Sequence, residues 1–176
     1  MSEGLPLSHP YNLNRLGQAG DRVDVQINDQ ERGALAQFVG VPRIESFSGQ
    51  VELKKTAPNR FQVDFGLAAD ICQSCVVTLA EVPAHIERRF RRELHFNPAL
   101  HRAADQADAG DIPLEDDVPE EIGSLHYDLA VPLIEEFVLG IDPYPRAPGA
   151  EFEAPNDGAK APESPFAVLK GLKSGL

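Results

Sequence analysis

Alternation of apolar and polar positions is the clearest signal in the first hundred residues. Residues 21–28 carry β-branched side chains at every second position, which predicts a half-buried strand. Two more alternating runs, residues 49–55 and 61–67, flank the turn-forming sequence of residues 56–59. The sequence therefore predicts an antiparallel hairpin there.

Two further segments have patterns that indicate elements around this hairpin. Before it, Asn28 or Asp29 can cap a short helix that Gly40 and Pro42 end. Its apolar side comprises Leu35, Phe38 and Val39. After it, residues 76–96 predict one long strand bent near Pro83, although the apolar spacing at positions 82, 86, 90 and 94 also fits a helix.

The best helix pattern runs from Tyr127 to Ile141, where apolar residues recur at helical spacing. Asp128 can cap this helix, and Pro132 is tolerated only within the first turn. Residues 97–124 have turn and acidic composition with little periodicity, which indicates a long loop.

These elements predict an α+β fold. We expect a strongly curved antiparallel sheet or partial barrel with a few packed helices. Residues 10–142 are expected to form a single domain that includes the acidic loop at about 97–124. Residues 143–176 read as an extended tail, in which Ser164 and Pro165 signal the start of a short C-terminal helix.

Composition narrows the class of protein. Leu, Ile, Val and Phe make up 27% of the 176 residues, which is enough for a hydrophobic core. No apolar run approaches the ~18 residues that cross a bilayer, and the N-terminus has no signal-peptide pattern. Two cysteines cannot form a disulfide scaffold, so we expect a cytoplasmic protein.

The negative charge is concentrated in one stretch. The net charge of the chain is −12, but residues 1–102 are neutral and residues 103–157 carry a net −14. An acidic chain does not bind DNA or other nucleic acid indiscriminately. The acidic block either solubilises a loop or docks on a basic partner. The partner-binding candidates within it are Asp111, Glu115, Asp116, Asp117, Glu120 and Glu121.

The main basic feature is a run of arginines around Phe90. Arginines beside an aromatic residue can hold phosphates and stack on bases, so Arg88, Arg89, Arg91 and Arg92 are candidates for RNA binding. If residues 87–95 form a strand, the acidic residues Glu87 and Glu93 share a face with Arg89 and Arg91. An internally salt-bridged face is the alternative interpretation.

Cys72 and Cys75 form a Cys-x-x-Cys pair. Two such thiolates can share a zinc ion if a turn at residues 73–74 aims both at it, and two more ligands are needed. In an extended strand, residues three apart point to opposite faces, and the chain then holds two buried thiols. We therefore expect no cofactor.

Signatures of enzymes are missing from the sequence. It contains no phosphate-binding GxxxxGK[ST], no GxGxxG, no HExxH and no GxSxG motif. We therefore expect a protein that is not an enzyme.

The order of these features resembles the YceD family, the large ribosomal RNA subunit accumulation proteins, in its alphaproteobacterial branch. The resemblance spans about residues 10–173. It rests on the Cys-x-x-Cys, the long strand, the acidic loop, the helix after Tyr127, the sequence Asp142-Pro143-Tyr144-Pro145-Arg146 and the ending Ser164-Pro165-Phe166-Ala167-Val168-Leu169-Lys170.

The resemblance implies a non-enzymatic role in the accumulation of 23S large-subunit ribosomal RNA, through processing, stability or assembly. Many members carry a second Cys pair after the long helix, which would complete a four-Cys zinc site. This chain has no cysteine between Asp142 and Phe152, which argues against zinc.

The leading hypothesis is thus a factor that contacts large-subunit rRNA through the arginines, or a basic large-subunit ribosomal protein through the acidic block. The charge distribution favours the second route. The alternatives are a general protein-interaction adaptor and a small Cys-x-x-Cys metal-binding or redox protein. The sequence does not determine the oligomeric state.

Overall fold

A computed structural model describes residues 4–100 and 119–152. The fold is α+β, with a five-stranded sheet in the order β2-β3-β4-β5-β6 and a two-stranded sheet of β1 and β7. The strands are β1 (Pro10–Asn12), β2 (Asp21–Gln26), β3 (Arg43–Ala57), β4 (Arg60–Ser74), β5 (Glu81–Phe96), β6 (Glu120–Ile122) and β7 (His126–Asp128). The helices are the 3-10 helix η1 (Leu13–Arg15), α1 (Asp29–Val39) and α3 (Ala130–Gly140).

The predicted hairpin is confirmed and is longer than the alternation indicated. β3 and β4 pair antiparallel from Arg43↔Cys72 to Ala57↔Arg60. Asn59 takes a positive φ of 63° in the connecting turn, a conformation that asparagine tolerates better than most residues. The hairpin forms the centre of the larger sheet.

The long strand is also confirmed, but its start was predicted five residues too early. β5 begins at Glu81, and residues 75–80 form a loop closed by hydrogen bonds from Cys75 N to Ala80 O and from Leu79 N to Cys75 O. Leu79 has a φ of 61° at its tip. The β-branched residues from Val76 favour a strand locally, yet Val76 N instead donates to Pro145 O. This tertiary contact outweighs the local propensity.

The sheet is mixed and open. β2 to β5 pair antiparallel, whereas β6 pairs parallel with the end of β5, from Leu94↔Glu120 to Phe96↔Ile122. The sheet does not close into a barrel, so a strongly curved sheet or partial barrel is not confirmed. β6 also lies within the range 97–124 that was expected to be a loop. No described helix is long and apolar enough to span a membrane.

The first predicted helix is confirmed as α1. Asn28 caps it in a reciprocal capping box with Glu31, and Gly40 ends it with a φ of 74°. Leu35 is buried as expected, but Phe38 is 51% exposed, so its assignment to the core was wrong. Ala36 is buried on the inner side instead, because α1 packs on β3 along a narrow stripe.

The second helix starts three residues later than predicted. Tyr127 and Asp128 belong to β7, which pairs with β1, and α3 begins at Ala130. Asp128 still accepts a hydrogen bond from Ala130 N at 2.9 Å. Pro132 lies in the first turn, as the sequence required. The tail helix expected at Ser164 lies outside the described residues.

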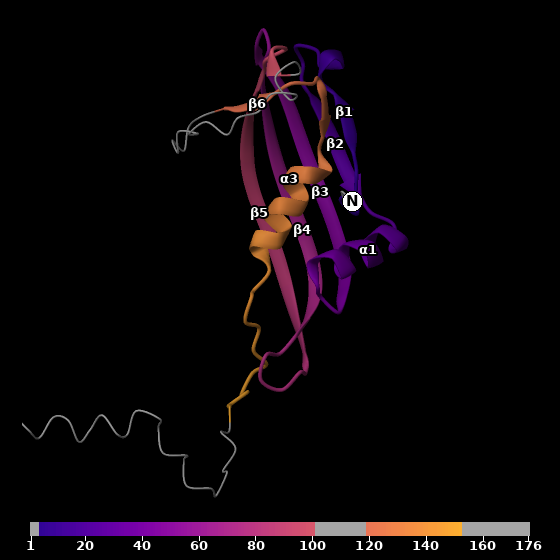
Figure 1. Cartoon of the computed structure of the whole chain (residues 1–176), viewed down its shortest axis with the longest axis vertical. Helices are drawn as coiled ribbons and strands as arrows, with labels where there is room; N and C mark the ends of the chain where they lie inside the picture. The colour runs from indigo at the N-terminus through magenta and orange to yellow at the C-terminus, as the bar shows by residue number, and fades with distance from the viewer. Residues whose placement is uncertain (1–3, 101–118, 153–176) are drawn as a thin grey trace, which may run out of the picture.

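The hydrophobic core lies on one face of the sheet. In Figure 1, α3 crosses β4 and β5. The ring of Phe137 in α3 meets the ring of Phe47 in β3 edge to face, with centroids 5.4 Å apart. Gly49 of β3 leaves the space into which Leu133 of α3 packs. The opposite face of β2 to β5, which we call the open face, is covered by none of the described elements, and its side chains are polar or small.

Candidate functional site

The four candidate arginines do not form one surface. β5 is an extended strand, so successive side chains point to opposite faces. Arg88 and Arg92 share the face of α3 with Phe90, whereas Arg89 and Arg91 lie on the open face. The sequence predicted this alternation, and the structure confirms that it divides the basic run in two.

Three of these arginines already contact carboxylates. Arg91 Nε lies 2.6 Å from Asp64 Oδ1, Arg92 Nη2 lies 3.0 Å from Glu135 Oε2, and Arg89 Nη2 lies 3.4 Å from Glu87 Oε1. Burial acts to raise the pKa of Asp64, but hydrogen bonds from Arg91 and Gln62 outweigh it and hold that pKa below its usual range. The alternative of a salt-bridged face thus describes most of the run, and a phosphate would have to compete with these carboxylates for Arg89, Arg91 and Arg92.

The two described acidic candidates are held by internal contacts. Tyr127 Oη donates to Glu120 Oε2 at 3.3 Å, and Asn97 Nδ2 donates to Glu121 Oε2 at 3.2 Å. Burial and the negative charge of Glu120 raise the pKa of Tyr127. The other acidic candidates lie outside the described residues; they are Asp111, Glu115, Asp116 and Asp117.

The Cys pair straddles the end of β4. Gln73 and Ser74 remain in the strand, so the turn that would aim both thiols at one metal ion is absent. Cys75 is fully buried, and its Sγ accepts N–H groups of Val77, Thr78 and Ala147 at 3.3–3.4 Å. Among the described residues no group of three potential metal ligands occurs, and this arrangement does not fit a tetrahedral zinc site.

The sulfur of Cys75 instead connects two distant segments. The N–H of Ala147 is the largest cause that lowers the pKa of the Cys75 thiol to about 6, and the hydroxyl and N–H of Thr78 add to it. Ala147 follows α3, whereas Val77 and Thr78 belong to the β4–β5 loop. The sulfur of Cys75 therefore fastens the segment after α3 to the end of the central hairpin.

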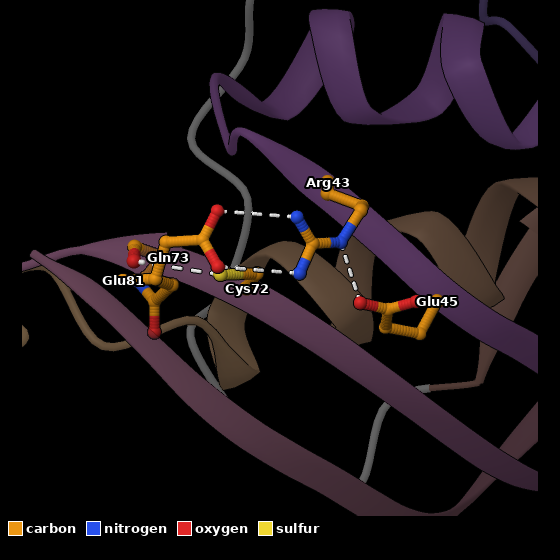
Figure 2. A network of polar contacts seen from close by, with 5 residues as sticks. All are labelled: Arg43, Glu45, Cys72, Gln73 and Glu81. Atoms are coloured by element: carbon orange, nitrogen blue, oxygen red, sulfur yellow. Dashed lines mark hydrogen bonds and ion pairs between the residues drawn. The ribbon is translucent and has the colours of Figure 1, made fainter.

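A polar network lies beside Cys72 (Figure 2). The guanidinium of Arg43 lies between the carboxylates of Glu45 and Glu81, with Arg43 Nη1 3.2 Å from Glu81 Oε1. The hydrogen bond from Arg43 is the main cause that holds the pKa of Glu81 below its usual range. This network joins β3 to the start of β5 across the end of β4, and it uses Nε, Nη1 and Nη2 of Arg43 for internal contacts.

A serine, an aspartate and a histidine meet on the open face without forming a catalytic triad. Ser46 Oγ donates to Asp70 Oδ2 at 2.7 Å, and His85 Nδ1 lies 2.7 Å from Asp70 Oδ1. In a hydrolase the histidine lies between the serine and the acid, where it can take the serine proton. Here the aspartate lies between them, so Ser46 is not activated as a nucleophile.

Sequence reasoning missed a groove on the open face. Two shallow hollows, of about 350 and 700 Å³, adjoin at Gly66 of β4, with Gln50 of β3 and Arg89 of β5 lining both. The small residues Gly66 and Ala68 form its floor. The signal in the sequence is a pair of small residues at alternate positions in an otherwise bulky strand.

Comparisons of the chain with protein-family models, with curated proteins and with solved structures found no match.

Proposed function

We propose that this chain is a non-enzymatic factor that supports the accumulation of 23S large-subunit ribosomal RNA, and that it acts by binding a basic large-subunit ribosomal protein. The resemblance of the sequence to the YceD family provides the ribosomal context. One structural observation favours the protein route over direct RNA contact: Arg89, Arg91 and Arg92 are paired with carboxylates, and the run is divided between two faces.

The charge distribution supports the same route. A cationic partner is attracted by the net −14 of residues 103–157, whereas the phosphates of RNA are repelled by it. An extended cationic segment of such a partner can lie against an acidic block. An acidic protein that holds such a segment would keep it available for the large subunit.

The test is crosslinking in growing cells, followed by denaturing purification of the tagged protein and identification of bound proteins and RNA. We expect a basic large-subunit protein to be recovered above an untagged control, and precursor rRNA only through that protein. A variant with Arg88, Arg89, Arg91 and Arg92 replaced by Gln should retain this partner.

A second variant with Arg15, Arg32, Lys55 and Arg60 replaced by Gln removes the same charge elsewhere and serves as the control. Direct RNA crosslinks that disappear only in the first variant would contradict the protein route. Recovery of neither RNA nor a ribosomal protein would contradict the ribosomal role and favour a general adaptor.

A further inference from the structure

Gly66 is a glycine that the fold itself does not require. It lies in the middle of β4 and does not have a positive φ, and a Cβ built on it meets only Gln50 O, at 3.9 Å. A glycine inside a strand costs about 0.5–1 kcal/mol relative to alanine. The irregularities in the β3–β4 register lie at Ile44/Ser46 and Lys55/Ala57 and not at Gly66, and a glycine inside a strand also marks places where a ligand or another backbone approaches closely.

The shape of the groove fits a single extended chain. Its floor follows β4, and its walls are side chains of β3 and β5, which lie about 10 Å apart because neighbouring strands are separated by about 4.8 Å. Gln50 on one wall and Arg89 on the other can hydrogen-bond to a peptide backbone above Gly66. The groove therefore has room for a backbone and polar groups that can pair with it.

The charges of the groove favour a basic chain. Its lining includes the carboxylates of Asp24, Glu52, Asp64 and Glu87 against the guanidinium groups of Arg89 and Arg91 on this face. Both arginines are paired within the groove, with Glu87 and Asp64. Within the described part of the chain, Asp24 has no ion-pair partner, and Glu52 has only Arg22 at 4.0 Å.

The same face is poorly suited to single-stranded RNA. Binding of unpaired bases relies on aromatic side chains for stacking. No Phe, Tyr or Trp side chain of β2 to β5 points to the open face. Phe65 and Phe90 point to the face that carries the core, where their rings stack with centroids 4.7 Å apart. A polypeptide is therefore the better occupant.

We infer that the groove over Gly66 and Ala68 binds an extended, basic polypeptide segment, whose backbone lies on Gly66 and whose cationic side chains reach Asp24 and Glu52. This inference rests on the proposed function, because it names the surface on which the basic partner docks. The acidic block can add long-range attraction, but the groove provides the specific contact.

The experiment measures binding of a labelled peptide of alternating lysine and glycine to the full chain by fluorescence anisotropy at low salt. Gly66→Val places a β-branched side chain on the groove floor, and we expect affinity to fall about tenfold or more while the melting temperature stays equal or rises. Gly33→Ala in α1, where a Cβ meets nothing within 4 Å, is the control and should bind normally.

A second variant avoids added bulk. Asp24→Asn with Glu52→Gln should weaken peptide binding and reduce its dependence on salt. Asp29→Asn with Glu151→Gln removes two charges outside the groove and should bind like the unaltered chain. Equal affinity of all four variants would overturn the inference, as would tight binding of an oligouridylate that Gly66→Val abolishes.

The cell-based crosslink separates this inference from the proposed function. If Gly66→Val loses the basic ribosomal protein that the unaltered chain recovers, both are supported. If Gly66→Val recovers it equally well, the groove is not the docking surface, while the proposed function stands. If the unaltered chain recovers no such protein, the proposed function is contradicted, and the groove is then judged by the peptide-binding measurement alone.

Discussion

Gly49 of β3 and Gly66 of β4 differ in whether the fold leaves room for a side chain. A Cβ on Gly49 would lie 2.6 Å from Leu133 Cδ1 in the core, whereas a Cβ on Gly66 would point into open space. In the sequence both are single glycines within alternating runs, and alternation places Gly49 on the face of Val51 and Leu53 but Gly66 on the face of Gln62 and Asp64. Only the packing of α3 on β3 shows that the first glycine is required by the fold and that the second is available for a ligand.

Gly49→Ala should destabilise the protein by about 1–3 kcal/mol, because overpacking in a core forces neighbouring side chains out of their preferred rotamers. Chemical denaturation measures the free energy of unfolding. Gly33→Ala in the exposed part of α1 should instead stabilise by about 0.5–1 kcal/mol, since alanine is the better helix former. Equal effects of the two substitutions would contradict the close approach of Leu133 to β3.

The thiol of Cys75 should make stability depend on pH. Its pKa is about 6 in the folded protein, against an ordinary value of 9.0 for a thiol, so the folded state favours the thiolate. The stabilising contribution is complete above the unfolded pKa, shrinks as the pH falls from 9 to 6 and is absent below the folded pKa. The advantage of the unaltered chain over Cys75→Ser should therefore grow as the pH is raised.

Urea denaturation midpoints across this pH range measure that difference. Cys72→Ser is the matched control, because Cys72 is also buried but its Sγ contacts Gln73 O at 3.9 Å and the Glu81 carboxylate instead of the backbone N–H groups that surround Cys75 Sγ. A gap between the unaltered chain and Cys75→Ser that is constant with pH would show that the three N–H groups do not stabilise a thiolate.

At the scale of elements, alternation predicted the central strands well because each has one buried and one exposed face. β3, β4 and β5 follow the apolar positions directly. The failures occur where a distant segment determines the local structure. Val76 bonds to Pro145 instead of extending β5, and Tyr127 pairs with β1 instead of beginning α3. Local periodicity contains no information about such partners.

Asp128 shows how one side chain can set the start of a helix. Its Oδ2 accepts from Ser8 Oγ at 2.6 Å, and its Oδ1 accepts from the N–H groups of His9 and Ala130 at 2.7 and 2.9 Å. Burial acts to raise the pKa of Asp128, but these hydrogen bonds hold it below its usual range. The carboxylate thus joins the N-terminal segment, β7 and α3.

Asp128→Asn should cost about 1.5–3 kcal/mol at neutral pH, the usual contribution of hydrogen bonds to a charged group. The asparagine side chain has one acceptor oxygen where the carboxylate has two. Its NH₂ group would therefore face at least one of the donors Ser8 Oγ, His9 N–H and Ala130 N–H. Urea denaturation measures the loss. The penalty should shrink at pH values below 3.8, where protonation of the aspartate removes its advantage. A penalty that persists unchanged in acid would contradict this role of the charge.

At the scale of the whole molecule, sequence predicted the charges of the candidate site and the pairing of Arg89 with Glu87, but not the partners of Arg91 and Arg92. The division of the arginines between two faces follows from alternation alone. Arg91 pairs with Asp64, which is 27 residues away along the chain, and this requires the register of β4 on β5. Arg92 pairs with Glu135, which is 43 residues away, and this requires the position of α3. The groove needs three strands in register, so no single segment predicts it.

The final prediction concerns acid stability of the whole protein. Asp64, Asp70, Glu81 and Asp128 each join separate elements, and each has a pKa below the ordinary value, which is 3.8 for aspartate and 4.5 for glutamate. A carboxyl with a depressed folded pKa stabilises the protein above its unfolded pKa and loses this contribution as the pH falls through the folded value. The urea midpoint should therefore fall between neutral pH and pH values below 3.8.

Repulsion among the excess carboxylates acts in the opposite direction, because protonation relieves it as the pH approaches the sequence pI of about 4.7. Salt distinguishes the two effects, since it screens long-range repulsion between exposed groups more than short hydrogen-bonded contacts. In high salt, where repulsion is screened, the midpoint should still fall in acid. A midpoint that rises on acidification in high salt would mean that these four carboxylates do not hold the elements together.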